Sequence, residues 1–106
     1  MEPLPTLLRV QNRTLKQIKR QGQAALYALS GMHGALYGYE LVIIRIRKAE
    51  EVFGKFYPER ETYPPSEAWG VLAWSYGRDQ KQDACAAFET LCAKLSDSLP
   101  IEDLAA

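Results

Sequence analysis

The residues that could carry out catalysis are few, and they lie far apart in the chain. His33 is the only histidine, and Cys85 and Cys92 are the only cysteines. A zinc site at His33 would need scattered carboxylates as further ligands, and a serine nucleophile would need the same histidine as its base. Turn-forming residues surround His33 and favour a solvated position for it. The sequence therefore predicts a protein that is not an enzyme, with no metal site and no cofactor.

The cysteines and the paired glutamates have structural explanations. Cys85 and Cys92 are seven residues apart on a predicted helix, which separates their Cα atoms by about 10 Å at 1.5 Å per residue. That distance is beyond disulfide reach, so we expect reduced thiols at the edge of a core. Glu59 and Glu61 share one face of a short predicted edge strand, where Arg60 between them favours a solvated face over a catalytic carboxylate pair.

A segment rich in aromatic residues and prolines, residues 49–66, is the first candidate for a binding surface. A loop this aromatic should not be freely solvated, and we expect its rings to pack onto the domain. Tyrosine and arginine dominate the energetics of protein interfaces. We therefore expect a non-enzymatic protein that docks to another macromolecule, first of all a protein, through a surface that contains Phe56, Tyr57, Arg60 and Tyr63.

Nucleic-acid binding is the alternative hypothesis. Residues 9–20 carry five cations and no acid, and two tyrosines with two arginines further along share one face of a predicted strand. Such a face resembles a platform on which unpaired bases stack while guanidinium groups contact phosphates. Solvated arginines and tyrosines packed under a loop are the preferred explanation of the strand pattern, and a solvated helix face explains the cations of residues 9–20 equally well. The residues of this alternative site are Arg9, Arg13, Lys16, Lys19, Arg20, Tyr37, Tyr39, Arg45 and Arg47.

Composition places the chain among ordinary globular domains. It has 106 residues, 47% of them hydrophobic, and its thirteen basic side chains balance thirteen acidic ones. The length predicts a single domain over residues 6–97, between a flexible tail at 1–5 and another at 98–106. The start lacks the pattern of a signal peptide, and no apolar run is long enough to span a bilayer, so we expect a cytoplasmic protein without a membrane partner.

Hydrophobic periodicity predicts an α+β fold. Apolar residues alternate in four segments, which predicts an antiparallel sheet of three to four strands over about 23–30, 35–48, 57–63 and 69–76. Three- and four-residue spacing then predicts a helix over 81–95 that packs on one face of the sheet through Phe88, Leu91 and Leu95. The glycine-bearing turn around residues 30–34 should connect the first two strands as a hairpin.

The segment 6–21 is open to two interpretations. Read as a short N-terminal helix, its apolar residues share one side and its cations the other, with Thr6 as the cap and Gly22 as the end. Read as a strand, the piece around 13–19 could pair, but Leu15 and Ile18 would then face opposite ways. The pattern favours the helix or a helical turn for its first part.

The second half of the chain resembles part of the WGR domain. The shared features are a strand over 39–46, a second strand opened by Trp69-Gly70, and a helix that carries Ala84, Phe88 and Lys94. The resemblance covers about half the chain, and Val71 stands where the family has the arginine of its naming motif. WGR domains are nucleic-acid-associated modules found beside poly(ADP-ribose) polymerase domains and in some bacterial proteins. The resemblance therefore implies association with nucleic acid.

A second resemblance concerns origin. A Tyr-Glu-x-x-x-Ile strand at 39–44, a Tyr-Pro-x-x-Glu-x-Trp-Gly loop at 63–70 and the terminal helix are similar to small uncharacterised proteins of bacteria and mobile elements. This resemblance implies no activity. An accessory or inhibitor protein fits such an origin.

Overall fold

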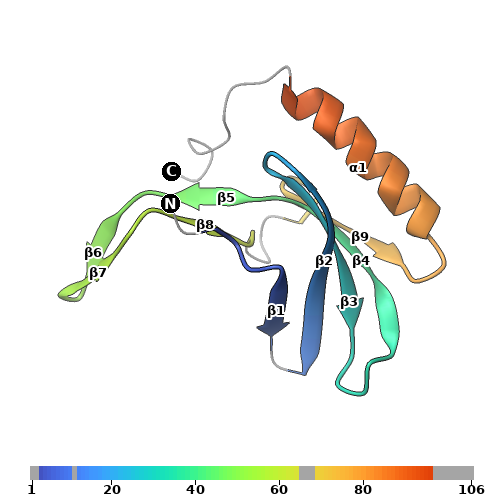
Figure 1. Ribbon diagram of the computed structural model, residues 1–106, viewed down its shortest axis with the longest axis horizontal. Helices are drawn as coiled ribbons and strands as arrows, with labels where there is room; N and C mark the ends of the chain where they lie inside the picture. Colours follow the sequence, from blue (N-terminus) through green and yellow to red (C-terminus); the bar gives the residue numbers. More distant parts are fainter. Residues whose placement is uncertain (1–2, 11, 65–68, 97–106) are drawn as a thin grey trace.

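An antiparallel sheet with one helix packed against it forms the body of the molecule. The computed structural model describes residues 3–10, 12–64 and 69–96. Within them, five strands lie in the order β1-β2-β3-β4-β9, and α1 crosses one face of the sheet (Figure 1). The bounds are β1 Leu7–Val10, β2 Arg13–Gln21, β3 Ala24–Ser30, β4 Leu36–Ile43, β9 Ala73–Gly77 and α1 Lys81–Ser96. The predicted α+β class, antiparallel sheet and C-terminal helix are confirmed, and the sheet has five strands rather than three or four.

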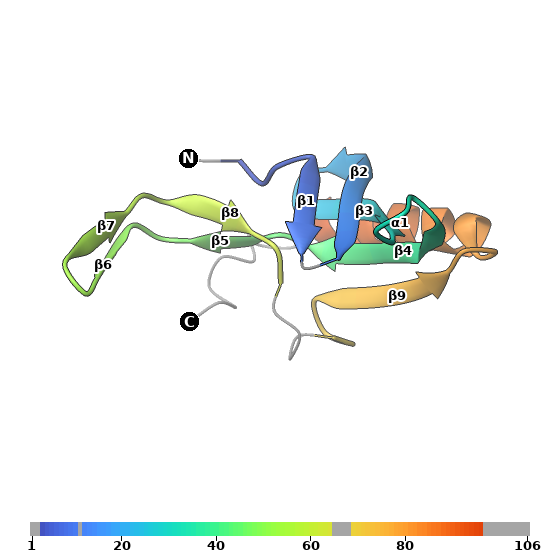
Figure 2. The same ribbon diagram turned by 90° about the horizontal axis from the view of Figure 1, so that it is seen from below.

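The chain between β4 and β9 leaves the body as a hairpin. β5, Arg45–Arg47, pairs with β8, Arg60–Thr62, and further out β6, Glu50–Val52, pairs with β7, Lys55–Tyr57. We call residues 45–62 the β-arm. It projects from one end of the sheet, away from α1 (Figures 1 and 2). The predicted strand 35–48 is therefore divided between body and arm, and the predicted strand 57–63 belongs to the arm rather than to the sheet.

One core lies between α1 and the sheet. Ala84, Phe88, Leu91 and Cys92 recur at helical spacing and are buried against the faces of β3 and β4 that carry Leu26 and Leu41. The helix-on-sheet prediction is thus confirmed, including the role of Phe88.

A second core covers the opposite face of the sheet. Tyr27 is completely buried there beside Val42, and its hydroxyl donates to the Pro5 carbonyl oxygen at 3.0 Å. Leu4 is buried in the same cluster, so part of the segment predicted as a flexible tail belongs to the core. Because the centre of the sheet is buried on both faces, β3 and the end of β4 have nearly continuous apolar sequences.

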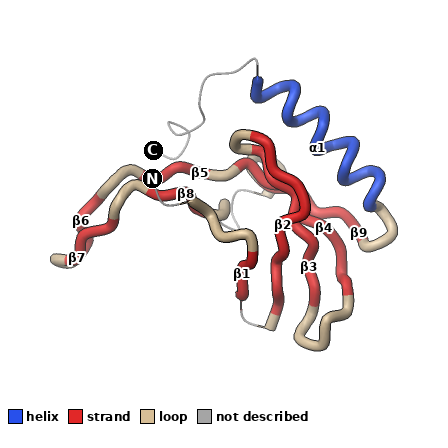
Figure 3. Tube along the Cα trace, in the orientation of Figure 1, coloured by secondary structure: helices blue, strands red, loops and turns tan. Residues whose placement is uncertain are grey.

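Leu7–Val10 and Arg13–Gln21 form strands, and the predicted N-terminal helix is wrong. Leu15 faces Leu8 on one side and Leu29 on the other, in a hairpin of β1 and β2 that continues into β3 (Figure 3). A β-bulge at Ile18 shifts the register and leaves that side chain partly exposed. Burial of Leu15 in the second core, together with cross-strand pairing, outweighs the helical spacing of the apolar residues.

The last strand of the sheet begins later than predicted. Trp69 makes only an isolated bridge to Ala73, and the Gly70 N–H donates to the Ala73 carbonyl oxygen at 2.7 Å. This turn needs a positive φ of 85° at Gly70, which glycine adopts without steric cost. The pairing of β9 with β4 therefore starts at Ala73 rather than at residue 69 or 70. The predicted C-terminal tail, residues 98–106, lies outside the described residues.

Candidate functional site

The β-arm is held together by strand pairing and polar contacts rather than by a core. Every residue from 45 to 62 is exposed or half-buried. A two-stranded hairpin without a hydrophobic face is marginally stable in water. The chain therefore builds a projecting element that contributes little to the hydrophobic core of the body.

The tip of the arm presents a phenyl ring to solvent. Phe53 and Gly54 form the two-residue connection between β6 and β7, with φ values of 51° and 78°. Positive φ at both positions is the geometry of a type I′ turn, in which asparagine followed by glycine is preferred. An L-residue such as phenylalanine carries a cost of roughly 1–2 kcal/mol in this conformation. Phe53 nevertheless occupies it, and its side chain is fully exposed, at 105%.

The two faces of the arm differ in chemistry. The register pairs Glu51 with Phe56, and cross-strand partners share a face, so these two side chains lie together. Phe56 is 65% exposed. On the other face Tyr57 pairs with Glu50 and is half-buried. The apolar surface of the arm is therefore the tip together with the face of Phe56.

On the opposite face, Tyr57 and Arg60 are bound within the arm itself. The Arg60 guanidinium lies 5.1 Å from the centre of the Tyr57 ring, and Lys55 Nζ lies 5.4 Å from it. Arg60 also contacts the Glu50 carboxylate at 3.1 Å, and Arg47 approaches the same carboxylate at 3.8 Å. Cation–π contacts of this kind stabilise exposed sites by about 0.5–1 kcal/mol. They stiffen the arm along its length.

Tyr63 belongs to the root of the arm, where the chain returns to the body. Its ring packs edge-on against the Tyr27 ring, with centroids 5.4 Å apart and an interplanar angle of 76°. Its hydroxyl donates a hydrogen bond to the Glu40 carboxylate. Burial raises the pKa of Tyr63 well above its ordinary value, and the neighbouring Glu40 carboxylate acts in the same direction. Of the four predicted docking residues, the structure thus brings Tyr57 and Arg60 together, separates Phe56 from them by register, and places Tyr63 against the second core.

An ion pair fixes the arm to the body. Arg20 donates from both terminal nitrogens to the Glu61 carboxylate, at 2.7 and 2.5 Å, and the Leu4 N–H donates to the same carboxylate at 2.9 Å. The hydrogen bonds from Arg20 lower the pKa of Glu61 below its ordinary value, and the carboxylate in turn raises the pKa of Arg20. Glu61 therefore joins β8 of the arm to β2 and to the N-terminal segment.

The five cations of residues 9–20 do not form one face. Lys16 and Lys19 lie opposite Ala28 and Leu26, whose side chains belong to the core beneath α1. Arg20 lies opposite Ala25, which belongs to the other core. Alternation along the strands then places Arg9, Lys16 and Lys19 on the side of α1, and Arg13 and Arg20 on the opposite side.

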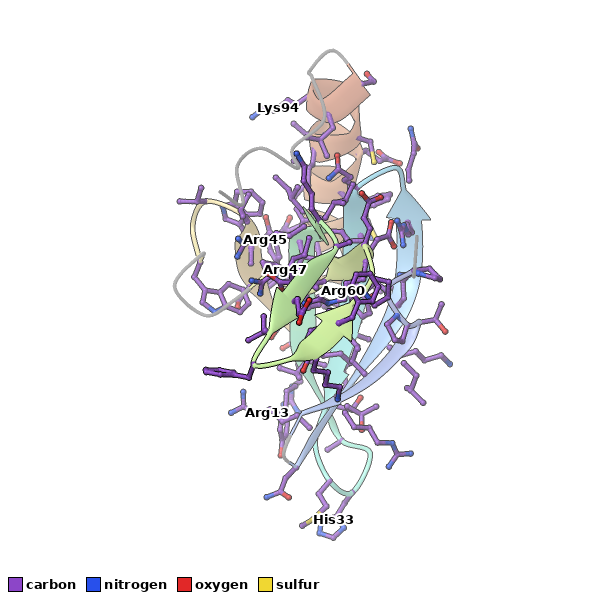
Figure 4. All side chains as sticks on the ribbon, turned by 90° about the vertical axis from the view of Figure 1, so that its left-hand side faces the viewer. Arg13, His33, Arg45, Arg47, Arg60 and Lys94 are labelled. Carbon is purple, nitrogen blue, oxygen red and sulfur yellow. The ribbon has the colours of Figure 1, made fainter. Side chains whose placement is uncertain are left out.

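The predicted tyrosine–arginine platform is also not formed. Tyr39 is buried beneath α1, with 6% exposure, whereas Tyr37 on the same strand is 56% exposed. Arg45 and Arg47 lie on the arm, because the chain leaves the main sheet after Ile43 (Figure 4). The helix occupies the face on which bases would have to stack.

The candidate catalytic residues lie on separate elements. His33 is in the turn between β3 and β4, and both cysteines are on α1, as predicted. Cys85 and Cys92 are free, and burial raises the pKa of the Cys92 thiol, which keeps it protonated at neutral pH. Over residues 3–10, 12–64 and 69–96, no cluster of histidine, cysteine, aspartate and glutamate suits a metal ion, and no helix has the length and apolar character to cross a membrane.

No family model, curated protein or solved structure matches the chain. The resemblances to the WGR domain and to small proteins of bacteria and mobile elements therefore stay predictions. Phe53 is a fully exposed aromatic residue that the predicted docking surface does not include. Its pattern was present, since Glu50-Glu51-Val52 and Lys55-Phe56-Tyr57 flank a two-residue connection that ends in glycine. The turn was not predicted because phenylalanine occupies the position where asparagine is usual in such hairpins.

Proposed function

We propose that the protein is a non-enzymatic docking protein that binds another protein through the tip of its β-arm. The single observation that carries this proposal is the fully exposed Phe53 in a disfavoured backbone conformation at the end of a projecting hairpin. Strained residues persist where the conformation serves a function. Aromatic side chains bury the largest areas at interfaces and make the strongest anchors.

The rest of the arm supports this role. Phe56 adds apolar surface next to Phe53, and Glu51 provides a charge on the same face of the arm. Contacts of Tyr57 with Arg60 and of Glu61 with Arg20 hold the hairpin in place before binding. A stiff arm loses less conformational entropy when a partner binds, which favours affinity.

Affinity capture from the cell of origin tests the proposal. The docking variant is Phe53→Asn/Phe56→Thr, which keeps turn and strand propensity but removes both rings. Met32→Ser is the matched control, because Met32 is an exposed apolar residue in the turn between β3 and β4. We expect the control to retain the partners of the wild type and the docking variant to lose at least one of them. Identical partners for all three proteins would contradict the proposal.

Nucleic-acid binding is a second candidate, and one observation favours it. Arg9, Lys16 and Lys19 are exposed on one face of β1 and β2, next to the strands on which α1 packs. Three phosphate contacts on a single strand would give a salt slope of about −2. Fluorescence anisotropy at low salt should then show binding that Lys16→Glu/Lys19→Glu abolishes and that Arg13→Glu, on the opposite face, leaves nearly unchanged. No binding by the wild type at micromolar protein would exclude this candidate.

A further inference from the structure

A cleft opens between α1 and the edge strand β9. Its volume is about 290 Å³, and it is lined on the sheet side by Leu41, Trp74 and Tyr76 and on the helix side by Ala87, Thr90 and Leu91. Trp74 and Tyr76 are half-buried, so parts of both rings face the opening. The cleft is thus a concave site with aromatic and aliphatic walls.

The cleft has the size and chemistry to hold a phenyl ring. An apolar cavity of about 150 Å³ already binds benzene in a protein interior, so a site of this volume has room for a phenylalanine side chain. Aromatic rings favour offset or edge-to-face contacts with one another, which Trp74 and Tyr76 can supply. Removing the apolar surface of the cleft and of a phenyl ring from water is favourable, which stabilises the bound state.

The arm carries the complementary group. Phe53 is fully exposed at the tip, so its ring does not have to leave a buried position before it enters a pocket. Glu51 lies on the same face of the arm as Phe56, whereas Lys55 lies on the other face, over the Tyr57 ring. Lys94 lines the cleft, so an approach through the face of Phe56 brings Glu51 toward this cation.

A chain cannot fill its own cleft with its own arm. The arm tip lies at one end of the long axis of the molecule, and α1 with β9 lies toward the other (Figure 1). We infer that the arm of one copy inserts Phe53 into the cleft between α1 and β9 of a second copy, which makes the docking partner of the arm another molecule of this chain. This inference rests on the proposed function of the arm. Because the tip and the cleft are different surfaces, the contact is heterologous and joins copies head to tail.

Light scattering coupled to size-exclusion chromatography tests self-association through two variants. Phe53→Asn removes the ring from the arm, and Thr90→Arg places a long charged side chain in the cleft. Glu89→Arg is the matched control, because Glu89 is exposed on α1 next to Thr90 but does not line the cleft. We expect the mass of the wild type and of the control to rise with protein concentration above that of one chain. Each of the two variants should stay monomeric.

Mixing the two variants gives the decisive measurement. Phe53→Asn retains an intact cleft, and Thr90→Arg retains an intact arm, so an equimolar mixture should form a one-to-one dimer that neither forms alone. A monomeric wild type at high protein concentration, or variants that associate like the wild type, would overturn the inference. If the wild type is monomeric but capture of another protein still requires Phe53, the docking function stands and only the assignment of the second copy fails.

Discussion

Phe53 is unfavourable in two ways, because its backbone has a positive φ and its apolar side chain is exposed to water. Asparagine tolerates positive φ far better than phenylalanine, so Phe53→Asn should relieve the strain in the turn and stabilise the tip by roughly 0.5–1 kcal/mol. The same substitution should abolish docking. Amide hydrogen exchange at Lys55, the first residue after the turn, measures the stability of the tip and should become slower.

Measuring both the stability and the docking of Phe53→Asn distinguishes a residue kept for function from a residue kept for stability. Replacing a residue that is retained for the stability of the fold destabilises the protein. Phe53→Asn should instead raise the stability of the tip while it abolishes docking. Phe53→Asn/Gly54→Ala is a suitable control, because alanine at a φ of 78° restores the strain and should cancel the gain. Faster exchange at Lys55 in Phe53→Asn would show that the phenyl ring supports the hairpin instead.

Residue identity alone gave part of the candidate site. Aromatic residues and prolines drew attention to residues 49–66, and Phe56 is indeed exposed there. Whether Tyr63 would face solvent or the second core depends on Tyr27, which is 36 positions earlier in the chain but in edge-to-face contact with it. The expectation that the rings of the segment pack onto the domain is correct for Tyr63 and wrong for Phe53 and Phe56.

At the scale of elements, the link between the arm and the body depends on the charge of Glu61. Its pKa is lower in the folded protein than in the unfolded chain, so ionisation favours folding. This contribution is fully present above the ordinary glutamate value of 4.5 and is lost as the pH falls through the folded-state pKa. Glu61→Gln should therefore reduce the free energy of unfolding by about 1.5–3 kcal/mol at pH 7, the range for hydrogen bonds to charged groups.

Urea unfolding between pH 7 and pH 3 checks this expectation. The difference between the wild type and Glu61→Gln should shrink as the pH falls below 4.5, because protonation of Glu61 removes the same interactions in the wild type. Glu59→Gln, an exposed neighbour, should follow the wild type throughout. A difference that does not change with pH would mean that the carboxylate charge is not what fastens the arm.

Elements with a strong local period were predictable, and those decided by long-range pairing were not. The apolar spacing of Ala84, Phe88 and Leu91 predicts α1 to within one residue of its observed end. In β2 the same kind of spacing was misleading, because Leu15 is buried through its partners Leu8 and Leu29 rather than through its own helical neighbours. The predicted strand 35–48 leaves the sheet after Ile43, because its second part pairs with β8. No local pattern in the sequence predicts that pairing.

At the scale of the whole molecule, global stability rests on the core between α1 and the sheet. Phe88 is buried there among residues of β3, β4 and α1, so Phe88→Ala should cost about 3–5 kcal/mol. Val71→Ala truncates an exposed apolar residue and should cost less than about 0.5 kcal/mol. Chemical denaturation monitored by tryptophan fluorescence measures both. A loss below about 1 kcal/mol for Phe88→Ala would be incompatible with the helix-on-sheet core.

The position of the β-arm in the chain also affects the order of folding. The strands β1 to β4 are joined by short turns and can pair through local contacts, whereas β9 must find β4 across the whole of residues 44–72. Pairing of β5 with β8 brings Arg45 next to Thr62 and leaves a much shorter stretch of chain to close. Each halving of a loop lowers the entropic cost of closure by about 0.6 kcal/mol. The arm adds almost nothing to the finished core. By shortening the loop between β4 and β9, it lowers the entropic cost of bringing β9 and α1 onto the sheet.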